Sequence, residues 1–238
     1  MPKAVILAAG RGTRLGALTD EVPKPMVLLH GRPILEHLLR RLESAGITEA
    51  LIVTGYRAEA IEKYFGGFSL PLGFVRQTEV NGTATAALLA QEFVGNDPFF
   101  LTFGDILAET VVYRDIQASV QPGIEALIGV KWVPDPYQGA AVYCDTSKKI
   151  IKIIEKPACG KSTTNWNSAG LYLFRPSLFT ELTRVTKSPR GEFELTSAVE
   201  QLIAAGHRLE IFPIEGAWRD IGRPEDLAAA SEEMQENR

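Results

Sequence analysis

A glycine-rich segment near the N-terminus carries residues suited to phosphate binding. The apolar run of positions 4–9 leads into glycines at positions 10, 12 and 16. Such a loop exposes backbone N–H groups and lets an anion approach closely. Arg11, Arg14 and Lys24 add three cations within 14 residues, although the whole chain has a net charge of -4. The coincidence of loop and cations favours a polyphosphate site over a plain glycine turn with solvated charges.

Two other glycine-loop patterns do not fit this segment. A dinucleotide-binding loop has the spacing G-x-G-x-x-G and an acidic residue at the tip of the next strand. Here the third glycine is Gly16, one position too late, and the residues after Val53 are Thr54 and Gly55. A P-loop needs G-x-x-x-x-G-K-[ST], a string that the sequence lacks. The spacing therefore disfavours an NAD-dependent oxidoreductase.

Two aspartates stand where a divalent cation could be held. Asp105 follows a glycine at the end of a predicted strand, and Asp220 lies within the string W-R-D-I-G. Mg²⁺ keeps several waters and takes one or two carboxylates beside phosphate oxygens. Each aspartate alone is equally compatible with an ordinary turn. As a pair beside a polyphosphate, Asp105 and Asp220 predict a Mg²⁺ site.

An adjacent acid and base, Glu155 and Lys156, follow the predicted strand at 150–154. The carboxylate could accept hydrogen bonds from sugar hydroxyls, and the ammonium could bind a phosphate. Taken alone, this pair is also compatible with the exposed edge of a hairpin.

The elements that must position these residues alternate in the first half of the chain. Apolar runs predict strands at 4–7, 51–53, 73–77 and 99–103, and helical periodicity predicts helices at 34–45, 58–65 and 84–93. Continuous apolar strands indicate a sheet that is covered on both faces, which is typical of a parallel α/β sheet. Ligands of such sheets bind at the carboxyl ends of the strands. The loops after Leu7, Val53, Gln77 and Phe103 are therefore expected on one rim.

The second half of the chain is less regular. Strands are expected at 124–131, 140–144, 150–154, 171–174 and 209–212, and helices at 194–205 and 224–234. There is no repeat, linker or low-complexity tract. One mixed α/β domain over residues 1–238 is the simplest account.

Composition excludes several other classes of protein. With 45% hydrophobic and 23% charged residues, the 238-residue chain is neither disordered, collagen-like nor a coiled coil. The net negative charge gives no attraction for nucleic acid or an anionic membrane. Two cysteines, Cys144 and Cys159, are too few for a disulfide framework, and no signal peptide or membrane span is evident. We expect a cytoplasmic protein and leave its oligomeric state open, a homo-oligomer included.

The motifs together carry a resemblance to a known family. The string L-A-A-G-x-G-T-R-L at 7–15, with P-K-P-M at 23–26, resembles the sugar-1-phosphate nucleotidyltransferases, or nucleotide-sugar pyrophosphorylases. The likeness continues in order through Gln77, Gly82-Thr83-Ala84, Gly104-Asp105, Glu155-Lys156-Pro157, Ala169-Gly170-Leu171-Tyr172, Arg190-Gly191-Glu192 and Trp218-x-Asp220-x-Gly222. It covers about residues 3–228, and the pattern is most similar to glucose-1-phosphate thymidylyl- and uridylyltransferases.

This resemblance implies a fold and a reaction. The fold is a Rossmann-like, mixed but mainly parallel sheet with helices on both faces, of the nucleotide-diphospho-sugar transferase type. A nucleotide-binding part at about 1–110 is followed by a sugar-binding part at about 111–228. A nucleoside triphosphate and a sugar 1-phosphate give a nucleoside-diphosphate sugar and pyrophosphate. The sugar phosphate is already a dianionic nucleophile at neutral pH, so none of the three histidines is needed as a base.

The resemblance also implies roles for single residues. Nucleotide binding falls to Leu7, Ala8, Ala9, Gly10, Gly12, Thr13, Gln77, Gly82 and Thr83, catalysis to Arg14 and Lys24, sugar-phosphate binding to Gly139, Glu155, Lys156, Ser168 and Arg190, and Mg²⁺ binding to Asp105 and Asp220. The pair Gln77 and Gly82 matches base-reading positions, so UTP or dTTP is the preferred nucleotide. GTP, CTP, a non-sugar phosphate acceptor and a non-catalytic nucleotide- or sugar-binding regulator remain alternatives.

The chain departs from the family pattern at two positions. Ile106 and Arg223 stand where many relatives carry a polar residue and a threonine, respectively. Because the sequence stops at residue 238, we expect no C-terminal left-handed β-helix and no acyltransferase activity of the kind found in some relatives.

Overall fold

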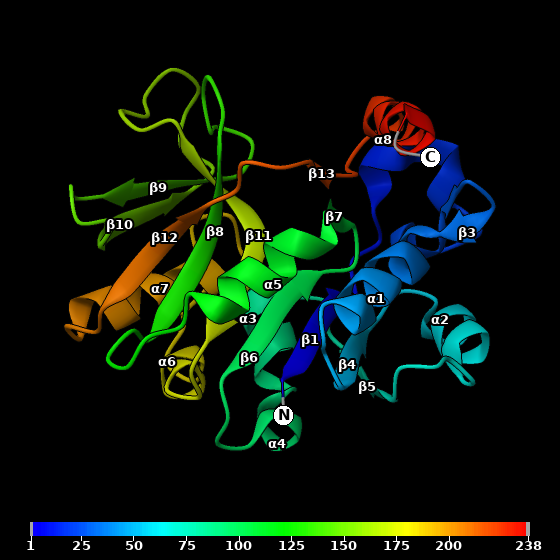
Figure 1. Cartoon of the computed structure of the whole chain (residues 1–238), viewed down its shortest axis with the longest axis horizontal. Helices are drawn as coiled ribbons and strands as arrows, with labels where there is room; N and C mark the ends of the chain where they lie inside the picture. Colours follow the sequence, from blue (N-terminus) through cyan, green and yellow to red (C-terminus); the bar gives the residue numbers. More distant parts are fainter. Residues whose placement is uncertain (1, 237–238) are drawn as a thin grey trace.

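A parallel sheet organises the first half of the chain in the computed structural model, which describes residues 2–236 (Figure 1). Its strands are β1 (Lys3–Ala8), β4 (Glu49–Thr54), β5 (Leu72–Arg76) and β6 (Phe99–Phe103). They lie in the order β6-β1-β4-β5, and Val5 of β1 has Leu51 and Leu101 as its neighbours. The predicted α/β arrangement and these four strands are confirmed.

Helices cover both faces of this sheet. One face carries α1 (Ile34–Ser44), α2 (Ala58–Phe65) and α5 (Thr110–Ala118), and the other carries α3 (Thr83–Leu88), α4 (Gln91–Val94), α6 (Leu178–Leu182) and α7 (Leu195–Ala204). Alternate residues of β1 enter the two cores: Ala4 and Ile6 pack with α1, while Val5 and Leu7 pack with α3 and α7. Both faces are buried, so the strand shows no polar alternation.

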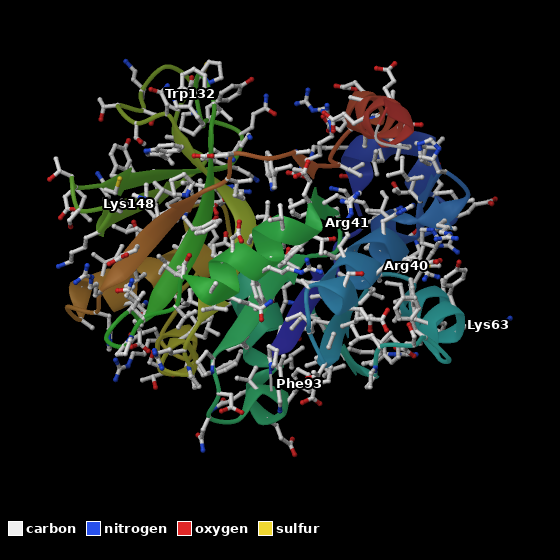
Figure 2. The ribbon with its side chains drawn as sticks, viewed as in Figure 1. Arg40, Arg41, Lys63, Phe93, Trp132 and Lys148 are labelled. Atoms are coloured by element: carbon white, nitrogen blue, oxygen red, sulfur yellow. The ribbon has the colours of Figure 1, made fainter. Side chains whose placement is uncertain are left out.

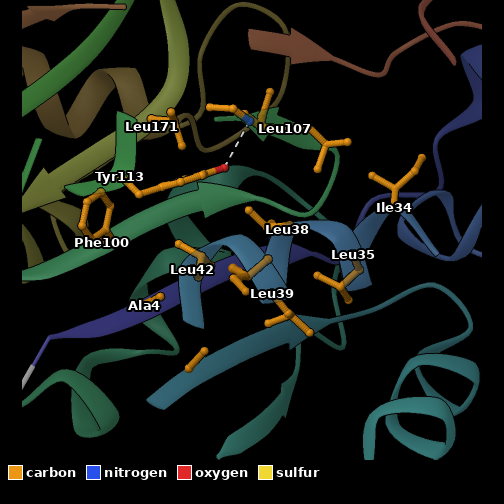
Figure 3. Packing of buried hydrophobic residues seen from close by; sticks show 14 of the residues in the cluster. Ala4, Ile34, Leu35, Leu38, Leu39, Leu42, Phe100, Leu107, Tyr113 and Leu171 are labelled. Atoms are coloured by element: carbon orange, nitrogen blue, oxygen red, sulfur yellow. Dashed lines mark hydrogen bonds between the residues drawn. The ribbon is translucent and has the colours of Figure 1, made fainter. Parts of the chain in front are cut away.

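The packing of α1 shows how sequence periodicity becomes a core (Figure 3). Leu38, Leu39 and Leu42 are fully buried on its inner face. Burying each such side chain contributes about 1.5–3 kcal/mol of transfer free energy. The buried Tyr113 of α5 packs into the same core, and its hydroxyl accepts a hydrogen bond from the backbone N–H of Ala108 at 3.3 Å.

The second half extends the sheet with antiparallel strands. These are β8 (Ala126–Trp132), β9 (Ala140–Cys144), β10 (Ile150–Glu155) and β11 (Trp166–Phe174), with β12 (Leu209–Pro213) parallel to β8. The long strand β11 pairs antiparallel with β6, β8 and β9. Its register shifts between Ser168 and Tyr172, around Gly170 with φ 68. Only the regular part beyond this bulge was predicted, because the bulge interrupts the apolar pattern.

One predicted helix is broken. The helix expected at 84–93 is two short helices, α3 and α4, separated at Leu89–Ala90. At the junction the N–H of Ala90 bonds to the carbonyl of Ala87, three residues back, which tightens the turn and ends α3.

Several short elements surround the carboxyl ends of the strands. They are the 3₁₀ turns η1 (Thr13–Thr19) and η2 (Lys24–Met26), the hairpin of β2 (Leu28–Leu29) and β3 (Arg32–Pro33), the antiparallel pair of β7 (Ile106–Ala108) and β13 (Trp218–Asp220), and the final helix α8 (Pro224–Glu236). None of the helices within residues 2–236 combines the length and the apolar character that spanning a membrane requires.

The predicted rim is present. The N–H of Tyr56, after β4, bonds to the carbonyl of Ala9, after β1, at 3.1 Å. The N–H of Gly104, after β6, bonds to the carbonyl of Leu7 at 2.9 Å. The ends of these three strands are therefore tied together at one edge of the sheet.

Candidate active site

The glycine-rich loop packs directly on Lys24. Gly12 has φ 71, and a Cβ added there would lie 2.5 Å from the Lys24 Cβ, so both conformation and space require glycine. Lys24 is only 7% exposed, at the start of η2. The aliphatic part of the Lys24 side chain therefore packs on the glycine loop that follows β1.

Lys24 lies between the two predicted metal ligands. Its ammonium pairs closely with the Asp105 carboxylate and lies 3.7 Å from Asp220 Oδ1. The pairing of β7 with β13 explains the geometry, because Asp220 stands opposite Ile106 and the N–H of Ile221 bonds to the carbonyl of Asp105 at 3.0 Å. Two acids 115 positions apart in the sequence thereby face one cation.

The electrostatics of this group disfavour two free carboxylates. Burial, followed by repulsion from Asp105, raises the pKa of Asp220 to about 6, although Lys24 and Arg14 act in the opposite direction. A single ammonium therefore compensates the pair incompletely. Mg²⁺ takes oxygen ligands and needs only one or two carboxylates when substrate phosphates and water complete its shell. The donor set of Asp105 and Asp220 fits such an ion.

A first cavity of about 320 Å³ opens beside the glycine loop. Of the residues predicted to bind nucleotide or catalyse, Leu7, Ala8, Ala9, Gly10, Gly12, Arg14, Lys24, Gln77, Gly82 and Thr83 line it, together with Asp105. Residues from the loop, η2 and the ends of β5 and β6 therefore share one wall.

The side chain of Gln77 is fixed at this wall. Its Nε2 donates to the Gly82 carbonyl at 3.0 Å and to Thr85 Oγ1 at 2.9 Å. Within residues 2–236, the structure gives its Oε1 no hydrogen-bond donor, which leaves that oxygen as the acceptor. Gly82 has φ 146, and a Cβ there would lie 2.1 Å from the Phe193 carbonyl oxygen.

A second cavity, of about 260 Å³, lies on the side of the antiparallel strands. The predicted sugar-side residues Gly139, Glu155, Lys156 and Ser168 line it. The N–H of Lys156 bonds to the Gly139 carbonyl at 2.7 Å. Burial, followed by the nearby Glu194 carboxylate, raises the pKa of Glu155.

The cavities meet at residues that both walls share. Arg14, Thr83, Phe103 and Asp105 line both the first and the second cavity. A third cavity of about 350 Å³, between segments 133–139 and 218–226, also has Arg14 and Asp220 in its wall. Arg14 is thus common to all three cavities.

Two predicted residues lie outside these walls. Thr13 is exposed at the start of η1. Arg190 makes ion pairs instead, with Glu194 at 3.1 Å and Glu155 at 3.4 Å. Arg190 is therefore linked to the second cavity through its ion pair with Glu155. The ligand roles of Thr13 and Arg190 stay predictions.

Other residues of these walls were named only within the family motifs, or not at all, and no site role was predicted for them. Trp218 and Asn167 line the second and third cavities, and Tyr172 lines the second, where its hydroxyl lies 2.8 Å from Ser168 Oγ. Trp218 stands two residues before Asp220, so a strand would place both on one face. The motif Trp218-x-Asp220-x-Gly222 contains that alternation and was the available signal for a role of Trp218.

Comparison with known proteins identifies the family. The family model described as nucleotidyl transferase matches residues 3–237. This chain therefore belongs to that family, and the predicted resemblance to sugar-1-phosphate nucleotidyltransferases is confirmed.

Three relatives show how much of the chain is similar to known proteins and at what sequence identity. The chain is 34% identical over 242 residues to the low-salt glycan biosynthesis nucleotidyltransferase Agl11 of Haloferax volcanii, covering 99% of this chain and 67% of that protein. It is 33% identical over 240 residues to the UTP–glucose-1-phosphate uridylyltransferase AglF of the same organism, covering 98% and 97%. The bifunctional protein GlmU of Methanocaldococcus jannaschii is 34% identical over 228 residues, but only 53% of its length is matched. The chain thus spans about half the length of that relative.

Solved structures share the fold. A UDP-glucose pyrophosphorylase complexed with UDP-glucose superposes with a TM-score of 0.91 at 22% identity, with 100% of both chains covered. A putative glucose-1-phosphate thymidylyltransferase from Bacillus anthracis, in complex with a sucrose, superposes with a TM-score of 0.86 at 26% identity, covering 98% and 94%. The predicted fold class is confirmed.

Proposed function

We propose that this chain transfers the nucleotidyl group of UTP or dTTP to a sugar 1-phosphate, with Mg²⁺ held at Asp105 and Asp220. The observation that carries the proposal is the junction of two cavities at Arg14 and Asp105, beside the Lys24 ammonium. The first cavity takes the nucleotide, and residues of about 1–110 supply most of its wall. The second cavity takes the sugar phosphate, and residues of about 111–228 supply most of its wall.

The reaction is an in-line displacement at the α-phosphorus. A sugar-phosphate oxygen forms the new bond to phosphorus, the bond to the bridging oxygen of the β-phosphate breaks, and pyrophosphate leaves with that electron pair. Lys24 and Arg14 offset the negative charge of the two substrates as they meet, and Lys156 holds the attacking phosphate. Mg²⁺, when bound, supplies further charge neutralisation at the phosphate oxygens.

The hydrogen bonds of Gln77 support the preference for a pyrimidine with a ring N–H. Both donors of its amide are committed to Gly82 and Thr85, so only Oε1 can read the base. Uracil and thymine present an N3–H donor to such an oxygen, whereas the N3 of cytosine carries a lone pair and would face it unfavourably. Guanine also presents a ring N–H, on a larger base. The relative AglF, a UTP–glucose-1-phosphate uridylyltransferase, supports UTP and glucose 1-phosphate as the first pair to test.

A pyrophosphate-release screen tests the proposal. The purified chain is mixed with Mg²⁺, one of UTP, dTTP, CTP, GTP or ATP, and one of a panel of sugar 1-phosphates. We expect release with UTP or dTTP, and no release in excess EDTA. Preference for GTP or CTP would overturn the base assignment alone. Silence across the panel, with phosphocholine also inactive, would favour a binding protein on this fold.

A further inference from the structure

A single crossing segment carries Asp220 from one half of the molecule to the other. Residues 214–222, which we call the strap, leave β12 beside the antiparallel strands and run to β13 and α8 (Figure 1). In β13 the strap pairs with only three residues of β7, ending with Asp220 opposite Ile106. A slip of one residue in so short a pairing would turn Asp220 to the opposite face. The direction of this carboxylate therefore depends on what fixes the strap.

The start of the strap is held by a lysine outside the cavity walls described above. Lys131, near the end of β8, directs its Nζ at three successive strap carbonyls: Ile214 at 3.1 Å, Glu215 at 3.5 Å and Gly216 at 3.1 Å. An ammonium has three N–H donors and no acceptor, so its donors are fully used by the strap. Hydrogen bonds from a charged donor are stronger than neutral ones. The backbone adds two bonds, from the N–H of Ile214 to the carbonyl of Val130 at 2.9 Å and from the N–H of Glu109 to the carbonyl of Ala217 at 3.2 Å.

The rest of the strap is fixed by contacts that depend on its register. Trp218 Nε1 donates to the Ala169 carbonyl at 2.7 Å, and the N–H of Ile221 donates to the Asp105 carbonyl at 3.0 Å. Arg219 pairs with Glu233 of α8. Each contact places one residue, but the length of chain available to reach them is set where the strap leaves β12 and is held by Lys131 of β8.

We propose that Lys131 is a positioning residue for the transfer reaction: its ammonium fixes the strap so that Asp220 faces Asp105 and Lys24. The kinetic part of this inference rests on the proposed function. Lys131 touches no reacting group, so its effect passes through the backbone of residues 214–220.

Three variants test the inference. Lys131→Met removes the ammonium and keeps the alkyl chain, and Lys131→Arg keeps a charged donor. Lys63→Met is the matched control, because Lys63 is an exposed lysine on α2 that points away from the molecule (Figure 2). We expect Lys131→Met to lower kcat by ~10–100-fold, the usual effect of losing a group that orients a metal ligand. The Mg²⁺ concentration for half-maximal rate should rise while KM for the sugar 1-phosphate holds, and Lys131→Arg should recover most of kcat.

Amide hydrogen exchange gives a readout that needs no turnover. In Lys131→Met the amides of 218–222 should exchange ~10-fold faster than in the wild type and Lys63→Met, while those of β1 and β4 stay unchanged. Unchanged exchange at 218–222, or faster exchange throughout the core, overturns the inference. If the wild type releases no pyrophosphate with any substrate pair, the proposed function fails, and the exchange result still decides whether Lys131 fixes the strap.

Discussion

At the scale of single residues, the site is organised by one buried cation between two acids. Lys24 offsets part of the negative charge of Asp105 and Asp220, and Asp105 in turn pairs with the ammonium of a residue that is only 7% exposed. The charges of Lys24 and Asp105 stabilise each other, because an unpaired charge in a partly enclosed site costs free energy. Charge that is preorganised in this way needs no rearrangement when the polyanionic substrates meet.

Removing either member of the ion pair should lower the rate of transfer, because the reacting phosphates lose a charge that is already in place. We expect Lys24→Ala and Asp105→Ala each to lower kcat by ~10²–10³-fold, the effect of deleting one preorganised stabiliser. The measurement is pyrophosphate release at saturating substrates, with circular dichroism to show that each variant is folded. Lys63→Ala, on the exposed side of α2, should keep the wild-type rate. A folded Asp105→Ala enzyme with wild-type turnover would remove the metal role of Asp105.

At the scale of elements, two loops that are distant in sequence are locked together at Gly82. The N–H of Phe193 bonds to the Asn81 carbonyl, and the N–H of Ala84 bonds to the Phe193 carbonyl, both at 2.9 Å. This contact leaves no room for a side chain at Gly82. The same glycine supplies the carbonyl that holds the Gln77 amide, so the loop contact also sets the position of the oxygen that we propose to read the base.

Gly82→Ala should disturb stability and nucleotide binding together. The new Cβ would meet the Phe193 backbone, and the residue would keep a φ that side chains rarely adopt. We expect the free energy of unfolding to fall by about 1–3 kcal/mol, as for other overpacked positions, and UTP to bind more weakly. Thermal unfolding and nucleotide titration measure the two effects. Gly67→Ala is the matched control, because nothing lies within 4 Å of a Cβ there and its φ is ordinary. Equal Tm and affinity in the two variants would contradict this account.

The elements also show what the sequence could and could not predict. The parallel half was predictable because α1 follows a helical apolar period and β1 is a continuous apolar run, and tertiary packing reinforces both patterns. The pairing of β7 with β13 was not, since three-residue strands carry no period and form only because distant segments meet. The two aspartates were recognised by type and motif, but their common contact with Lys24 depends on that pairing. The ion pair between Arg190 and Glu155 likewise depends on tertiary contacts that the spacing of residues in the sequence does not specify.

At the scale of the whole molecule, the two cavities belong largely to different halves of the chain and share four lining residues. The parallel strands with the glycine loop form the first cavity, and the antiparallel strands form most of the second. A net charge of -4 gives the molecule no general attraction for anions, so the approach of two phosphates must be favoured locally. Arg14 is the cation that both cavities share.

Arg14 and Lys156 should therefore separate in two-substrate kinetics. Arg14 lines both cavities, whereas Lys156 lines only the second of the two. A hydrogen bond to a charged group contributes about 1.5–3 kcal/mol, so Arg14→Ala should raise KM for both the nucleotide and the sugar 1-phosphate by ~10-fold or more. Lys156→Ala should raise KM for the sugar 1-phosphate alone. The measurement is initial rate with each substrate varied at several fixed concentrations of the other. If Arg14→Ala changed KM for the nucleotide only, the two cavities would not share that cation, and Lys24 would have to offset the charge at the junction by itself.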